Sequence, residues 1–169
     1  MNYRSKLKES DVQAIIEIVK STGFFSDSEI EIAEELAREN LTKGAEKSGY
    51  IFNLAEKEDS LVAFSCYGKT PGTEDSFDLY WIAVHQSERG NGIGKILMEM
   101  AVEDIARLSG KNIWIETSSR PIYDPTRHFY LKCGCEIMAE LPHFYGRNDN
   151  KIILLKKTMK VNPITAILL

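Results

Sequence analysis

The sequence predicts a single domain of the mixed α/β class, in which helices cover the faces of a mixed sheet. Two observations predict this class. Apolar patterns of helix type and of strand type alternate along the chain, and its 169 residues suit one domain. The expected order is strand, two helices, three strands, helix, strand, short helix and two strands. We expect the domain to span residues 1–160, followed by a short apolar tail over residues 161–169.

The first two helices are indicated by capping patterns and apolar stripes. The first is expected to begin at Ser10, since Ser10–Gln13 reads as a capping box, and to end at Gly23. The second is expected to begin at Ser26, with Glu29 completing its capping box.

Three strands are expected next, because short runs rich in β-branched and aromatic residues are separated by polar turns. They cover residues 49–56, 60–68 and 77–84. Together they are typical of an antiparallel meander.

The second half of the chain repeats these signals. A helix is expected over residues 92–108, capped by Gly110, then a strand over 111–117, a short helix over 126–133, and strands over 135–143 and 151–157. The long helix is expected to bury Ile96, Leu97, Met100, Ala101 and Ile105.

Composition limits the function classes. The net charge of −4 argues against nucleic acid as the main partner, and no apolar run is long enough to span a membrane. The three cysteines make neither a disulfide framework nor a zinc site, and we expect no bound metal. The chain is expected to be reduced and cytoplasmic.

The stretch Glu88–Ile96, "ERGNGIGKI", joins a strand to a helix and carries the strongest chemical signal. Its glycines do not have the Rossmann spacing, and a P-loop would need glycine where Arg89 stands. What remains is Arg89-x-x-Gly92-x-Gly94. Glycines let backbone N–H groups converge on an anion, and the positive end of a helix adds to the attraction. A turn that binds no ligand would not explain why Arg89 and Lys95 flank the glycines.

This stretch closely resembles the pyrophosphate loop of the GNAT N-acetyltransferase superfamily, whose pattern is Gln/Arg-x-x-Gly-x-Gly/Ala. Thr126–Cys135 resembles the superfamily's second signature, a helix carrying Phe-Tyr followed by glycine. The order of elements matches from about residue 3 to 158. The resemblance implies a six- to seven-stranded, mostly antiparallel sheet that is splayed in the middle, with about four helices.

The resemblance also implies acetyl-CoA as the co-substrate. Main-chain groups around Ile82, Ala83 and Val84 are then expected to pair with the pantetheine arm. The pyrophosphate is expected to bind Arg89, Gly90, Asn91, Gly92, Ile93, Gly94 and Lys95. An asparagine that often contacts pantetheine in relatives is missing here, and Ser118 and Ser119 are the candidates to replace it.

Acetyl transfer to an amine needs a proton acceptor and a proton donor. An alkylamine with a pKa of about 10.4 costs about 4.6 kcal/mol to deprotonate at pH 7, and the departing thiolate is better released as a thiol. Tyr130 occupies the position of the general-acid tyrosine in the resembled motif. Glu116 and Asp78 are both candidates for the base. The alternative is that each carboxylate only tunes the local field or binds a cation. His85 and His128 are expected to be bystanders.

The acceptor is expected to lie near aromatic side chains with carboxylates close by, which suits a primary amine. These aromatics are Phe24, Phe25, Phe144 and Tyr145. The predicted function is transfer of acetyl from acetyl-CoA to a small-molecule amine or a peptide N-terminus, by direct attack in a ternary complex. The alternatives are a non-catalytic acyl-CoA-binding regulatory module, and transfer to oxygen or of a longer acyl chain. A homodimer is a further possibility, with the tail docked on a second subunit.

Overall fold

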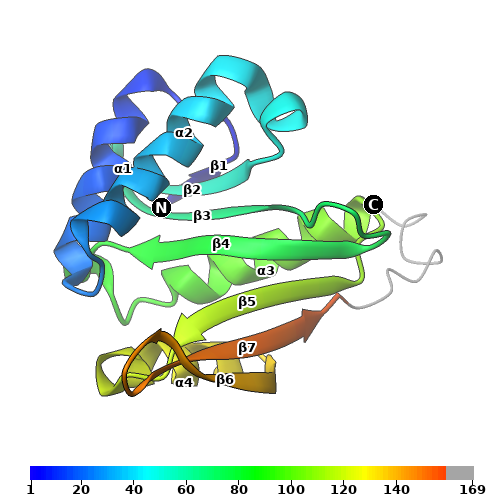
Figure 1. The fold of residues 1–169 in the computed structure, drawn as a ribbon. Helices are drawn as coiled ribbons and strands as arrows, with labels where there is room; N and C mark the ends of the chain where they lie inside the picture. The colour runs from blue at the N-terminus through cyan, green and yellow to red at the C-terminus, as the bar shows by residue number, and fades with distance from the viewer. Residues whose placement is uncertain (159–169) are drawn as a thin grey trace. The chain divides into compact units, whose positions relative to one another are not determined.

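The computed structural model describes residues 1–158, and it confirms the predicted fold class. A seven-stranded sheet has the strand order β1-β2-β3-β4-β5-β7-β6, and four α-helices accompany it within the described residues (Figure 1). The strands are β1 Asn2–Arg4, β2 Ile51–Lys57, β3 Ser60–Lys69, β4 Ser76–Val84, β5 Asn112–Ser118, β6 Glu136–Gly146 and β7 Asp149–Lys157. The α-helices are α1 Glu9–Thr22, α2 Asp27–Ser48, α3 Ile93–Arg107 and α4 Asp124–Lys132, and the short 3₁₀ turns are η1 Gln86–Glu88 and η2 Pro121–Tyr123.

The described residues form two compact units. The first comprises Met1–Gly68 and Leu79–Met100, and the second comprises Lys69–Asp78 and the chain from Ala101 onward. The first unit therefore holds β1 to β3, α1, α2, η1, the end of β4 and the start of α3. The second holds the start of β4, the end of α3, β5 to β7, η2 and α4.

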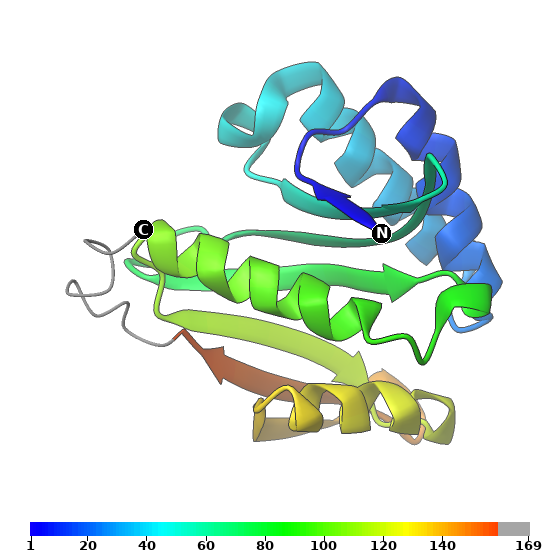
Figure 2. The same cartoon turned by 180° about the vertical axis from the view of Figure 1, so that it is seen from behind.

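In the first unit, strand alternation divides apolar residues between two helical layers. β2 pairs antiparallel with β1 and with β3. Phe52, Leu54 and Phe64 lie in a buried cluster with α1 and α2, whereas Ala55 and Ala63 contact α3 on the other face. Figures 1 and 2 show these two layers from opposite sides. The start of α3 is thus fixed by small side chains that let it approach β2 and β3.

The predicted start of the first helix is wrong by two residues. The N-cap is Lys8, not Ser10, and the Asp11 carboxylate accepts the Lys8 N–H at 2.7 Å. Arg4 of β1 holds that carboxylate with bonds of 2.9 and 2.7 Å. The cap therefore depends on a tertiary contact. Gly23 ends the helix in the left-handed region, with φ of 70°, as predicted.

The predicted start of the second helix is confirmed. Ser26 is the N-cap, and its Oγ accepts the Glu29 N–H while the Glu29 carboxylate accepts the Ser26 N–H. This reciprocal pairing satisfies amides that a helix start leaves open.

In the second unit, β5 pairs antiparallel with β7, and β7 with β6. The parallel ladder between β4 and β5 joins Ser76–Asp78 to Asn112–Trp114. β4 continues to Val84 beyond that ladder, and β5 continues to Ser118. Figure 2 shows α4 against β6 and β7.

The predicted cap Gly110 takes part in closing the C-terminal end of α3, but it is not the left-handed residue of that cap. The Gly110 N–H donates to the Ile105 carbonyl at 2.8 Å, and a Cβ at this glycine would lie 2.5 Å from Ile105 and 2.6 Å from Phe77. The residue with left-handed backbone here is Ser109, whose φ is 63°. Glycine at 110 is needed for space.

One residue of α3 that was predicted to be buried, Ile96, is not buried. Ile96 is 38% exposed, whereas Met98 is 1% exposed. Leu97, Ala101 and Ile105 follow one another at spacings of four and are buried as expected. Met98 lies three residues before Ala101 and so joins their stripe, which displaces Ile96 to its margin.

The proposed tail over residues 161–169 lies outside the described residues. In the part of the chain that the structure describes, none of the helices combines the length and apolar character needed to cross a membrane.

Candidate active site

The glycine loop in the first unit has the backbone of an anion cradle. Gly90 and Gly92 have φ of 83° and 78°, which side-chain-bearing residues rarely adopt, and a Cβ at either would meet open space. Helix α3 begins at Ile93, directly after them. The local strand-to-helix connection predicted from the sequence is therefore present.

The amides of this loop are available to a ligand. The backbone bonds around it run from Arg89 N–H to the Gln86 carbonyl and from Ile96 N–H to the Gly92 carbonyl. Within residues 1–158 the intervening amides of residues 90–95 have no backbone acceptor, as expected at a helix start. No acidic residue lies in the first turn of α3. A diphosphate fits this donor set, because the helix dipole and these N–H groups both favour negative charge.

Neighbouring elements fix the entrance of the loop. The His85 N–H donates to the Val62 carbonyl on β3 at 2.8 Å, and the Gln86 N–H donates to Ser21 Oγ on α1 at 3.1 Å. The loop therefore starts from a position set by both α1 and the sheet.

Arg89 and two of the predicted acceptor aromatics also lie in the first unit. The Arg89 guanidinium carbon is 4.8 Å from the centre of the Phe24 ring, and partial burial lowers the pKa of Arg89. Phe25 packs on Trp81 with ring centres 4.7 Å apart. A residue predicted to bind the cofactor and a residue predicted to bind the acceptor are thus in contact.

The end of the strand before the loop packs its side chains on both faces of the sheet. Ala83 is buried in the cluster with α1 and α2, whereas Ile82 and Val84 pack against the cluster at α3. Their side chains are therefore used on the two faces of the sheet, and a contact of their main chain with pantetheine stays a prediction.

Tyr130 lies on α4 in the second unit and is buried, at 7% exposure. Among residues 1–158 no hydrogen bond of its hydroxyl is found. Burial raises its pKa, and the nearby Cys135 and Cys133 thiols raise it further. The side chain is therefore a neutral phenol at pH 7 whose proton is not committed to another group.

Asp78 lies on the β4 segment that pairs with β5, and its carboxylate accepts a 2.8 Å hydrogen bond from the Thr70 hydroxyl. Burial raises the pKa of Asp78, the Thr70 bond lowers it, and the negative charge of Glu116 raises it. Asp78 pairs with Trp114, so Asp78, Trp114 and Glu116 share one face of the sheet.

Glu116 is in a different environment, although it is close enough to influence Asp78. Its side chain is 54% exposed, and one carboxylate oxygen lies 2.6 Å from Lys151 Nζ. The Lys151 ammonium also lies 3.7 Å from the centre of the Phe144 ring and 5.8 Å from that of Tyr145. The Lys151 ammonium thus lies against one carboxylate and two aromatic rings. A carboxylate and aromatic rings are also the groups that bind the ammonium of an amine ligand.

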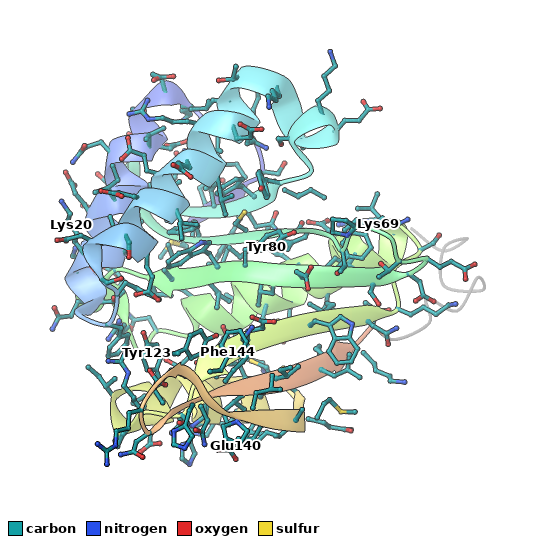
Figure 3. The ribbon with its side chains drawn as sticks, in the orientation of Figure 1. Lys20, Lys69, Tyr80, Tyr123, Glu140 and Phe144 are labelled. Atoms are coloured by element: carbon teal, nitrogen blue, oxygen red, sulfur yellow. The ribbon has the colours of Figure 1, made fainter. Side chains whose placement is uncertain are left out.

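The two rings are held by an irregular part of β6. Pairing with β7 shifts between Leu141 and Gly146, and Phe144 (Figure 3) and Tyr145 are both about half exposed, with ring centres 5.1 Å apart. The Asn150 side chain accepts the His143 N–H at 2.8 Å. This bulge is therefore braced from β7.

Ser118 and Ser119 have partners inside the second unit. The Ser118 hydroxyl donates to Asp149 and accepts the Arg120 N–H, and the Ser119 hydroxyl accepts the Asn150 N–H at 2.8 Å. These bonds brace the turn after β5. A contact of either serine with pantetheine stays a prediction.

The predicted site residues thus form one group in each unit. The loop residues 89–95, Ile82–Val84, Phe24 and Phe25 lie in the first unit, and Asp78, Glu116, Ser118, Ser119, Tyr130, Phe144 and Tyr145 lie in the second. His85 bonds to Ser87, and the His128 side chain is exposed on α4.

Sequence reasoning missed Lys151 and also missed Lys57, whose Nζ lies 2.8 Å from Glu88. Each lysine is far from its carboxylate partner in the sequence, so no sequence motif joins the two.

A metal site is not evident in the same region. Within the described residues, no three His, Cys, Asp or Glu side chains are grouped so that they could hold a metal ion. The cysteines at positions 66, 133 and 135 are free thiols.

Comparison with known proteins places the chain in a family. The model of the acetyltransferase (GNAT) family matches residues 12–135. A crystal structure of a GNAT-family protein from Desulfovibrio desulfuricans is 37% identical, with a TM-score of 0.90, and the match covers 94% of this chain and 99% of that one. The chain therefore belongs to the GNAT family of acetyltransferases, enzymes that use acetyl-CoA.

More distant solved structures share the fold. An aminoglycoside 6′-N-acetyltransferase in complex with coenzyme A has a TM-score of 0.74 at 20% identity, covering 94% of this chain and 98% of that one. The ribosomal-protein-S18-alanine N-acetyltransferase from Escherichia coli has a TM-score of 0.73 at 17% identity, covering 95% and 96%. A search of curated protein sequences finds no match.

Proposed function

We propose that this enzyme transfers the acetyl group of acetyl-CoA to a primary amine, by direct attack of the amine on the thioester. The observation that carries this is the loop at residues 90–95, whose amides have no backbone acceptor among the described residues and which opens helix α3. The diphosphate of coenzyme A supplies the negative charge that such a loop favours. Arg89 adds a guanidinium beside it.

Tyr130 is proposed as the proton donor. When the amine attacks, the C–S bond of the thioester breaks, and the sulfur leaves as a thiolate that needs a proton. A buried phenol with no partner among residues 1–158 can supply it. The raised pKa keeps the phenol protonated until the thiolate forms.

Asp78 is proposed as the proton acceptor in preference to Glu116. A base must be ionised and free to take a proton from the amine. The Glu116 carboxylate is already paired with the Lys151 ammonium at 2.6 Å, so it is not free to approach the amine. Asp78 has no cation within salt-bridge distance in the described part of the chain, and burial raises its pKa toward the range in which a base works well. Glu116 then tunes Asp78 through its charge.

The acceptor is proposed to be a primary amine on a partly apolar body, either a small molecule or a peptide N-terminus. The aromatic rings of Phe144 and Tyr145 and the carboxylate of Asp78, all in the second unit, support this choice, and a role of Phe24 and Phe25 in binding the acceptor stays a prediction. The fold neighbours that acetylate aminoglycosides and a ribosomal-protein alanine are consistent with both versions. The cytoplasmic location and the homodimer stay predictions.

Release of free thiol from acetyl-CoA tests the proposal. The purified chain is assayed over a panel of polyamines, aminoglycosides, amino acids and short peptides, and acetyl-CoA affinity is measured separately. Turnover with at least one amine is expected, and Arg89→Ala should weaken acetyl-CoA binding. Tight acetyl-CoA binding without turnover on any amine would favour a regulatory binding module instead.

A further inference from the structure

A carboxylate lies next to the loop that we assign to the diphosphate. Glu88 is the last residue of η1 and directly precedes Arg89, and its side chain is 14% exposed. Left alone, this charge would repel a bound diphosphate and would offset part of the attraction of Arg89 and the loop amides. The loop is therefore expected to bind an anion more tightly when Glu88 is neutralised.

A lysine from another part of the chain provides that neutralisation. Lys57 ends β2, and its Nζ lies 2.8 Å from Glu88 Oε1. The other carboxylate oxygen of Glu88 faces the Asn91 side-chain nitrogen at 3.5 Å, inside the glycine loop. Each charge stabilises the other, since the pKa of Glu88 is lowered and that of Lys57 is raised, in both cases mainly by their shared hydrogen bond. Glu88 thus faces both the lysine and the loop.

The lysine is carried by a tight hairpin turn. Lys57 pairs with Ser60 across a two-residue hairpin, in which Glu58 and Asp59 have φ of 49° and 60°. Left-handed backbone at both turn residues is the conformation that matches the twist of a tight hairpin. The same hairpin makes a second contact with this segment, since the Val62 carbonyl on β3 accepts the His85 N–H. The two contacts fix both ends of the segment from His85 to Glu88.

We propose that Lys57 is a positioning residue for acetyl-CoA: it neutralises Glu88 and holds the segment that leads into the glycine loop. This rests on the proposed function, since it assumes that the loop binds the diphosphate. Lys57 itself need not touch the cofactor. Its contribution is exerted through Glu88, so it should matter for ligands that carry the diphosphate and not for those that lack it.

Three variants test this: Lys57→Met, Glu88→Gln and the double variant. Lys43→Met is the matched control, since Lys43 forms a comparable exposed ion pair with Glu39 on α2. For each, the Kd for acetyl-CoA is measured together with kcat/KM for acetyl-CoA and for acetyl-pantetheine, which has the thioester but no diphosphate. Thermal unfolding is followed in parallel.

Lys57→Met is expected to weaken acetyl-CoA binding about tenfold while kcat/KM for acetyl-pantetheine stays within about twofold. The double variant is expected to recover most of the lost affinity, because the unpaired carboxylate is gone. Lys43→Met should leave all three values unchanged. Equal losses for both thioesters, or a double variant no better than Lys57→Met, would overturn the inference. If the unaltered chain does not bind acetyl-CoA, the proposed function fails as well; if it binds and Lys57→Met binds equally, this inference alone is wrong.

Discussion

Lys151 places its ammonium nitrogen 2.6 Å from a carboxylate oxygen of Glu116, two residues along β5 from the position that pairs with Asp78. The two acidic residues share a sheet face but have different partners, an ammonium for Glu116 and the Thr70 hydroxyl for Asp78. This difference is the reason for assigning the base role to Asp78. It also makes the assignment testable.

Removing each carboxylate in turn should separate the two roles. Asp78→Asn is expected to lower kcat by roughly 10²–10⁴-fold, because the amine loses its proton acceptor. Glu116→Gln should cost less than about tenfold, since only a nearby charge is lost. Steady-state kinetics with the best amine of the panel gives both values. The reverse ranking would transfer the base role to Glu116.

The same pair predicts a shift in the pH profile. A base works only when ionised, so activity should fall as the pH drops through the pKa of Asp78. The negative charge of Glu116 raises that pKa, and Glu116→Gln should therefore move the acidic limb of kcat/KM to lower pH. An acidic limb at unchanged pH in Glu116→Gln would show that Asp78 is not the titrating group.

Asp78 should also cost the fold some stability at neutral pH. Because its pKa is raised on folding, the folded state binds this proton more tightly than the unfolded state does. That contribution is fully present below the unfolded pKa of about 3.9 and is lost as the pH rises through the folded value. Asp78→Asn is therefore expected to raise the Tm at pH 7 while activity falls. A lower Tm would contradict this account.

Tyr130→Phe should lower kcat by roughly 10²–10⁴-fold while acetyl-CoA affinity stays nearly the same, because only the proton donor is removed. The hydroxyl has no partner among residues 1–158, so its loss should not lower the Tm. Tyr123→Phe, also buried and in the same unit, is the matched control and should keep its activity. Full activity of Tyr130→Phe would exclude the phenol from the reaction.

A separate prediction concerns the stability of the first unit. Arg4 bonds to both Asp11 and Glu56, and all three side chains are at most 15% exposed. Arg4→Met leaves the buried Asp11 carboxylate without a cation and leaves Glu56 with Lys8 alone, and it is expected to cost about 3 kcal/mol in urea unfolding. Lys8→Met removes an exposed partner of Glu56 and should cost less than about 1 kcal/mol. Similar losses for the two variants would contradict the burial argument.

Local patterns in the sequence predicted what short-range physics determines. The capping box at Ser26, the end of α1 at Gly23 and the glycine loop before α3 are all confirmed, since each depends on residues within a few positions of one another. The start of α1 could not be predicted in this way. Its cap is completed by Arg4 from a neighbouring strand, and Ser10 competes for the same role on sequence alone.

In the candidate site, too, features set by neighbouring residues were predicted and features set by distant residues were not. The glycine loop before α3 and the helix that carries Tyr130 were predicted from local patterns, and their roles in binding and catalysis stay predictions. The partners that decide how the carboxylates behave were not readable. Lys151 is 35 residues from Glu116 (151 − 116), and Lys57 is 31 residues from Glu88. Such pairs are created by strand register, which a single sequence does not specify.

The most direct test of the central claim is a crystal structure of the chain with acetyl-CoA. The account predicts that the diphosphate oxygens lie about 3 Å from the amide nitrogens of residues 90–95, with the Arg89 guanidinium beside them. A diphosphate bound elsewhere, with those amides facing solvent, would contradict it.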